Sequence, residues 1–150
     1  MQFNSFPPTD RSAGFRSERL GHLVTRPGGG DPGARSTWFG RLCLPGQESA
    51  TELILQGTGK APFRSQLIGA GKVMDTVEDI RYALRRSLRR YPGKFRDVNP
   101  DDWHGDLISV IATDADTDTF ELTFEWGRPP ALRALAFDWA GGVPHDLRLY

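Results

Sequence analysis

The chain has almost no cysteine and no long apolar run. Cys43 is the single cysteine among 150 residues, so no disulfide can form within the chain. Disulfides commonly staple small secreted domains, and their exclusion here favours a reducing compartment. No apolar stretch approaches the roughly 18 residues that a membrane-spanning helix needs. We therefore expect a soluble, cytoplasmic protein that does not enter a membrane.

Histidine is scarce too, and the motifs of common cofactor sites are missing. The three histidines, at positions 22, 104 and 145, lie far apart in the sequence. Zinc ligands usually come in closely spaced pairs, and neither these histidines nor Cys43 forms one. The Gly-Lys pairs at 59–60 and 71–72 lack the earlier glycine and the following Ser or Thr of a P-loop. We expect no metal and no cofactor.

One acidic motif has the carboxylate spacing of a calcium loop. Asp114, Asp116, Asp118 and Glu125 occupy the first, third, fifth and twelfth positions of an EF-hand frame. The sixth position, where the sharp turn needs glycine, is Thr119, and the flanking segments have the pattern of strands rather than helices. These departures favour a solvated hairpin turn over a calcium site.

Length and composition predict one folded domain with an N-terminal extension. Residues 1–36 are rich in Pro, Gly and Arg, and we expect irregular structure there, because proline and glycine interrupt both helices and strands. Phe3, Phe6 and Phe15 could hold this segment against the body. Residues 37–150 are predicted to form a single α+β domain.

The strongest helix signal runs from about Val77 to Tyr91. Apolar residues recur there at helical spacing, Thr76 is the expected N-cap with Asp79 three residues on, and Pro92 follows the last turn. The apolar face of this helix consists of Val77, Ile80, Ala83, Leu84, Leu88 and Tyr91.

Alternating apolar and polar residues predict strands on both sides of this helix. Before it, 37–44 and 51–56 should form a hairpin, 63–68 a short third strand, and 69–71 a loop. After it, four strands joined by short links should form an antiparallel meander. Those four strands are expected at 107–112, 119–126, 131–138 and 146–150. The predicted fold is an antiparallel sheet, made of an N-terminal hairpin and a C-terminal meander, with one main amphipathic helix on one face.

The net charge of zero conceals a strong asymmetry along the chain. Residues 81–96 include seven basic residues and no acidic one, whereas residues 97–125 include nine acidic residues and no Lys or Arg. Charge complementarity governs partner choice and association rate at protein interfaces. We therefore favour a non-enzymatic protein-binding module whose partner has a basic surface. The predicted contact residues are Asp114, Asp116, Asp118, Glu121, Glu125 and Trp126.

In its size, its single α+β domain and its acidic sheet, the chain is similar to many small bacterial immunity proteins and inhibitors. Such proteins neutralise a toxin or defence enzyme by covering its basic active site. The likeness implies an inhibitor or immunity-type role. It rests on no shared motif, so it assigns no role to any residue.

Two alternatives stay open. Arg85, Arg86, Arg89 and Arg90, at the end of the predicted helix, could bind the phosphates of a nucleic acid, although the sequence pI of about 6.8 is not basic. The second alternative is a small hydrolase or transferase centred on His104, which has the carboxylate of Asp106 nearby as in a general-base pair. No nucleophile can be assigned to that pair.

Overall fold

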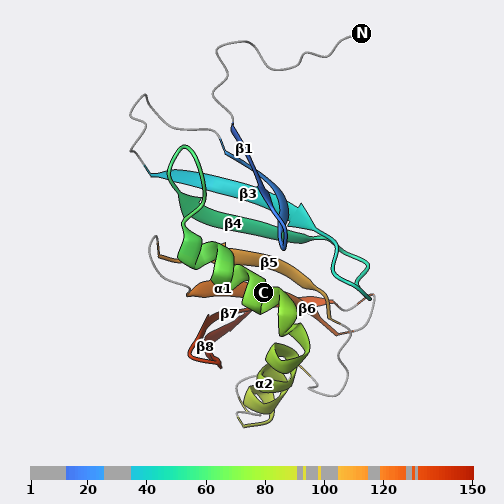
Figure 1. Cartoon of the computed structure of the whole chain (residues 1–150). Coiled ribbons are helices and arrows are strands. Elements are labelled where there is room, and N and C mark those ends of the chain that lie inside the picture. Colours follow the sequence, from blue (N-terminus) through green and yellow to red (C-terminus); the bar gives the residue numbers. More distant parts are fainter. Residues whose placement is uncertain are drawn as a thin grey trace.

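The computed structural model describes residues 13–25, 35–90, 105–114, 119–127 and 132–150, and the single positions 93, 98 and 130. In this part of the chain, eight strands form one sheet and two helices lie against it (Figure 1). The α+β class is confirmed. The strands are β1 (Ala13–Ser17), β2 (Gly21–Thr25), β3 (Ser36–Leu42), β4 (Thr51–Gly57), β5 (Leu107–Ala112), β6 (Phe120–Trp126), β7 (Arg133–Ala140) and β8 (Val143–Leu149), and the helices are α1 (Arg64–Asp75) and α2 (Val77–Arg90).

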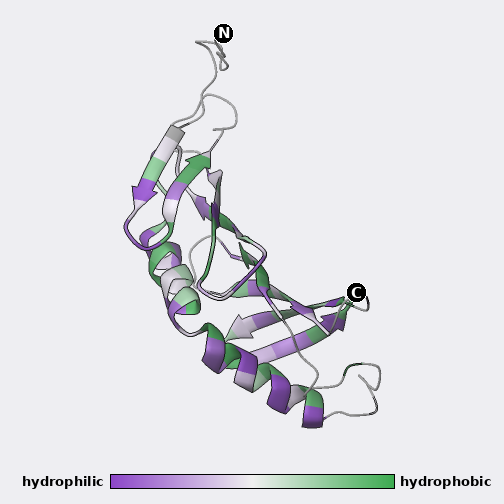
Figure 2. Ribbon diagram, turned by 90° about the vertical axis from the view of Figure 1, so that its right-hand side faces the viewer, coloured by the Kyte–Doolittle hydropathy of each residue, from purple (hydrophilic) through white to green (hydrophobic). Residues whose placement is uncertain are grey.

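The sheet is mixed rather than wholly antiparallel, which corrects the prediction. Its strands follow sequence order from β1 to β8, and neighbouring strands are antiparallel except for β4 and β5. Parallel neighbours need a long crossover connection, and here α1 and α2 provide it. Both helices lie along one face of the curved sheet (Figure 2). We call the opposite face the open face.

The core lies between the helices and the sheet. Every second residue of β4 and β6 is buried there, including Leu53 and Leu122, because side chains alternate between the two faces of a strand. Helix α2 contributes Ile80, Leu84 and Leu88 from its predicted apolar face. This helix face therefore packs on the core, as the helical spacing predicts.

Helix α1 replaces the strand predicted at 63–68 and the loop predicted at 69–71. Glycine lowers intrinsic helix stability. Because Gly69 and Gly71 lie within this segment, the sequence did not predict a helix there. Both glycines are buried, and tertiary contacts compensate for their low propensity. The fully buried Gln66 accepts a hydrogen bond from the backbone N–H of Gln56 at 2.6 Å and donates one to the carbonyl of Asp114.

Thr76 joins the two helices instead of only starting the second. Its hydroxyl donates back to the carbonyl of Lys72 at 2.7 Å, and its own carbonyl accepts the N–H of Ile80 at 3.0 Å. The predicted capping box with Asp79 would direct that hydroxyl forward into α2. The residue thus serves as the C-cap of α1 and the link to α2.

Part of the N-terminal segment is regular, although the sequence predicts it to be irregular. Strands β1 and β2 form an antiparallel hairpin whose turn places Gly21 at a φ of +79°. Leu20 and Leu23 are completely buried, and Phe15 contacts the ring of Trp38 edge-on. The hairpin therefore belongs to the sheet and to the core. The Pro/Gly run at 26–34 lies outside the described residues.

We expect Leu84→Ala to lower the free energy of unfolding by about 2–5 kcal/mol, because its fully buried side chain would leave a cavity under the sheet. Ile68→Ala is the matched control, since Ile68 lies on α1 with 50% of its surface exposed, and it should cost less than about 1 kcal/mol. Urea unfolding of both variants measures the difference. Equal losses of unfolding free energy in the two variants would show that α2 does not bury its apolar face.

Candidate functional site

The open face carries a row of apolar side chains across four neighbouring strands. Val24, Phe39, Ile54 and Ile111 are successive cross-strand neighbours on β2, β3, β4 and β5. Val24 is 43% exposed and Phe39 46% exposed, while the two isoleucines are half-buried. We call these four residues the apolar stripe. Contiguous exposed apolar groups on a soluble domain commonly mark an interaction surface.

The stripe runs directly into a charged cluster. Ile111 lies opposite Glu121 of β6, which in turn lies opposite Asp138 of β7. The guanidinium of Arg148, on β8, lies 2.6 Å from the carboxylate of Glu121, 2.8 Å from that of Asp146 and 3.5 Å from that of Asp138. We call these three acids and Arg148 the acidic cluster.

Arg148 neutralises this cluster only in part. Partial burial by itself would lower the pKa of its guanidinium, but the carboxylates of Asp138, Glu121 and Asp146 outweigh that effect, so the pKa is raised. Arg148 is therefore a fixed cation. Because one cation faces three carboxylates, this end of the open face stays negative and can attract a basic partner.

The five predicted acidic contact residues fall into three groups. Glu121 and Glu125 project from β6 on the open face, and the Glu125 carboxylate accepts a hydrogen bond from the Ser49 hydroxyl at 3.3 Å. Asp114 is exposed just beyond β5. Asp116 and Asp118 lie outside the described residues. The structure therefore brings two of the predicted acids to one face.

Trp126 was wrongly predicted as a contact residue. Its surface is 1% exposed, and it belongs to the core together with Phe124 and Leu122. These residues are two positions apart along β6, so they point to the same side of the sheet. A side chain in this phase cannot contact a partner on the open face.

The apolar stripe was not predicted from the sequence, although the chain contains a signal for it. In β4, Ile54 stands between the core residues Leu53 and Leu55, where alternation calls for a polar residue. Phe39 stands next to the buried Trp38 in the same way. Apolar residues in the outward phase of a strand are the pattern that would have identified this surface.

The four helix-end arginines spread over about 140° of the circumference of α2. Consecutive residues on a helix project about 100° apart, so Arg85 and Arg86 point in different directions. Arg86 and Arg90 line a hollow beside the β7–β8 turn, and the guanidinium of Arg86 also lies 5.9 Å from the ring of Tyr82. Arg85 and Arg89 do not line this hollow. This hollow therefore includes two of the four predicted arginines.

Of the predicted general-base pair of His104 and Asp106, Asp106 lies within the described residues. His104 lies outside the described residues. The carboxylate of Asp106 accepts hydrogen bonds from the backbone N–H groups of Glu48, at 3.1 Å, and Ser49, at 2.8 Å. Asp106 therefore orders the loop between β3 and β4.

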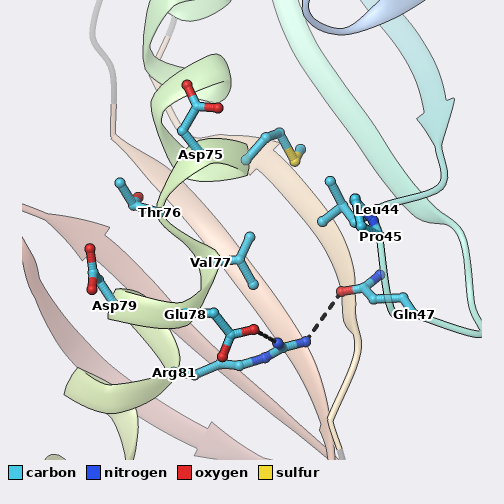
Figure 3. Close-up of a pocket in the computed structure, with 10 residues that line it drawn as sticks. Leu44, Pro45, Gln47, Asp75, Thr76, Val77, Glu78, Asp79 and Arg81 are labelled. Carbon is cyan, nitrogen blue, oxygen red and sulfur yellow. Dashed lines mark hydrogen bonds and ion pairs between the residues drawn. The ribbon is translucent and has the colours of Figure 1, made fainter.

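A cleft of about 380 Å³ lies where the two helices meet (Figure 3). Leu44 and Val77 line it. The guanidinium of Arg81 donates to the carboxylate of Glu78 and, at 3.4 Å, to the side-chain oxygen of Gln47. The same guanidinium donates to the carbonyl of Gly105 at 2.6 Å. These polar contacts connect α2 to the β3–β4 loop and to the start of β5. The polar groups of the cleft therefore stabilise the fold.

Among the described residues, no three His, Cys, Asp or Glu side chains are grouped so that they could hold a metal ion. None of the described helices is long and apolar enough to cross a membrane. Comparison with protein-family models, with curated proteins and with solved structures gives no match.

Replacing Arg148 by methionine should lower the free energy of unfolding by roughly 1 kcal/mol, because three carboxylates lose their shared cation at a partly exposed site. The loss should shrink in molar salt, which screens the remaining repulsion. Urea unfolding at low and high salt measures both effects. Arg41→Met, exposed on the same face, is the control and should change stability little. A loss for Arg148→Met that does not depend on salt would contradict the electrostatic explanation.

Proposed function

We propose that the chain is a protein-binding module that contacts its partner through the open face of the sheet. The observation that carries this proposal is the junction of the apolar stripe with the acidic cluster on a face that no described helix or strand covers. The partner is expected to present an apolar patch beside basic side chains. An inhibitor or immunity-type protein that covers a basic active site fits this description.

Phe39 is the expected centre of the contact. Aromatic side chains often dominate interface energetics, because they bury a large area with little loss of conformational freedom. Phe39 lies in the middle of a row between Val24 and Ile54, so a partner that covers the row would desolvate all three side chains together. Burial of this apolar surface would provide affinity that does not depend on salt.

The acidic cluster is expected to contribute mainly to the rate of association. Charges at the rim of an interface attract an oppositely charged partner and orient it before contact. Glu125 adds a fourth carboxylate on β6, four positions beyond Glu121 and on the same face. A basic partner would therefore approach with its cations toward β6 and β7 and its apolar patch toward β3 and β4.

The test has two stages. A protein that co-purifies with the chain from its native cells is identified, and its dissociation constant is measured with purified variants. Phe39→Ala should weaken binding about 30-fold or more, the effect of losing roughly 2 kcal/mol at an interface hot spot. Ile68→Ala is the control, because Ile68 is a similarly exposed apolar residue on α1, away from the open face. It should leave binding unchanged.

Charge reversal tests the acidic cluster separately. Glu121→Lys with Glu125→Lys should slow association with that partner, and the effect should diminish as salt is added. Arg86→Glu with Arg90→Glu, on α2, should have a much smaller effect. A partner that binds the Phe39 and glutamate variants as tightly as the unchanged protein would contradict the proposal. Sedimentation showing that Phe39→Ala only abolishes self-association would also contradict it, because the occupant would then be a second copy.

A further inference from the structure

Two adjoining hollows lie on the helical side of the molecule, between the helices and the turn that joins β7 to β8. One has a volume of about 340 Å³ and the other about 260 Å³, and Gly142 lines both. The first is also lined by Lys72 of α1 and Trp139 of β7. The second is lined by Arg86 and Arg90 of α2. We call the two hollows together the basic groove.

All the charged side chains of the basic groove are cations. Lys72, Arg86 and Arg90 are exposed, and none of the described residues that line the groove is acidic. The cleft at the helix junction differs in this respect, because it is lined by Asp75, Glu78 and Asp79. The chain has equal numbers of acidic and basic residues, so a groove lined by cations alone reflects their arrangement and indicates an anionic ligand.

The two hollows meet at the turn between β7 and β8, where Gly142 lines both. Ala140 pairs with Val143, which leaves Gly141 and Gly142 as a two-residue turn with φ angles of +63° and +77°. Positive φ at both positions is typical of the type I′ turn that glycine favours. The turn therefore places no side chain where the hollows meet.

The cations are spread along a line rather than around a point. Lys72 and Arg90 are separated by 18 positions on two successive helices, a distance of up to about 27 Å at 1.5 Å per residue. One small anion cannot contact both ends of such a row. An extended polyanion with regularly spaced charges can.

Trp139 distinguishes a nucleic acid from other polyanions. Its half-buried ring packs edge-on against Phe137, with the ring centroids 6.3 Å apart, and it lines the same hollow as Lys72. Proteins that bind single strands without sequence preference combine cations for the phosphates with aromatic rings on which bases stack. An acidic peptide would use the cations but would gain less from the ring.

We propose that the basic groove binds single-stranded nucleic acid, with phosphates on Lys72, Arg86 and Arg90 and a base against Trp139. The groove includes two of the four predicted arginines, Arg86 and Arg90, together with Lys72 and Trp139. The groove lies on the face opposite the apolar stripe, so the proposal does not depend on the protein-binding role of the open face.

The test is fluorescence anisotropy of a labelled twelve-nucleotide oligothymidine with the full chain. Each phosphate contact on a single strand contributes a slope of about −0.7 to the logarithm of affinity against the logarithm of salt. Three contacts predict a slope of about −2, so raising salt from 50 to 200 mM should weaken binding roughly 20-fold. An absence of binding at 50 mM salt and high-micromolar protein would overturn the proposal.

Paired variants locate the site. Arg86→Gln with Arg90→Gln should leave one phosphate contact, and the same increase in salt should then weaken the residual binding only about threefold. Arg16→Gln with Arg41→Gln removes the same charge from the opposite face of the sheet and should bind like the unchanged protein. Equal losses in both pairs would show a general charge effect and would refute the groove as the site.

Two further probes separate the contribution of the bases from that of the phosphates. An abasic strand with the same number of phosphates should bind at least about fivefold more weakly, because a stacked base is lost. An oligoglutamate peptide of equal charge should also bind more weakly than oligothymidine. Equal affinity for either probe would mean that the groove recognises negative charge alone, and the nucleic-acid assignment would be wrong.

Discussion

The parallel pairing of β4 with β5 is the constraint on which the rest of the structure depends. All other strand pairs join neighbours in sequence through local connections, but this pair joins two halves of the sheet across both helices. Side-chain amides bridge the pair at both ends. Gln66 bonds to Gln56 and to the carbonyl of Asp114 beyond one end, and at the other Gln47 accepts the N–H of Leu107 at 2.8 Å and donates to its carbonyl at 3.2 Å. The apolar stripe is continuous only because this pairing aligns Ile54 with Ile111.

The sequence predicted those elements whose local pattern agrees with their final environment. The strands β3 to β8 overlap the ranges expected from alternation, and α2 begins at the predicted residue, Val77. Helix α1 escaped detection because Gly69 and Gly71 lower its intrinsic propensity, and the contacts that compensate come from residues distant in sequence. Strands β1 and β2 escaped detection because they are short and adjoin a Pro/Gly-rich run. In each case tertiary contacts outweighed local propensity.

The candidate site was predictable to a similar extent. Glu121 and Glu125 lie in the outward phase of β6, and the same alternation places Trp126 in the core, so that error could have been avoided from the sequence. The position of Arg148 beside Glu121 could not have been foreseen. It depends on the pairing of β6, β7 and β8 and on the register shift between Ala136 and Asp138. The continuation of the apolar stripe to Ile111 likewise needed the crossover, which local patterns do not encode.

The crossover also has a consequence for how the chain folds. The residues paired across β4 and β5, such as Leu53 and Val110, are 57 positions apart, whereas the hairpins on either side close over short loops. Closing a long loop costs chain entropy before its contacts form. We therefore expect the two halves of the sheet to assemble early and the β4–β5 seam to form late. A substitution that weakens only this seam should then accelerate unfolding and leave the refolding rate almost unchanged.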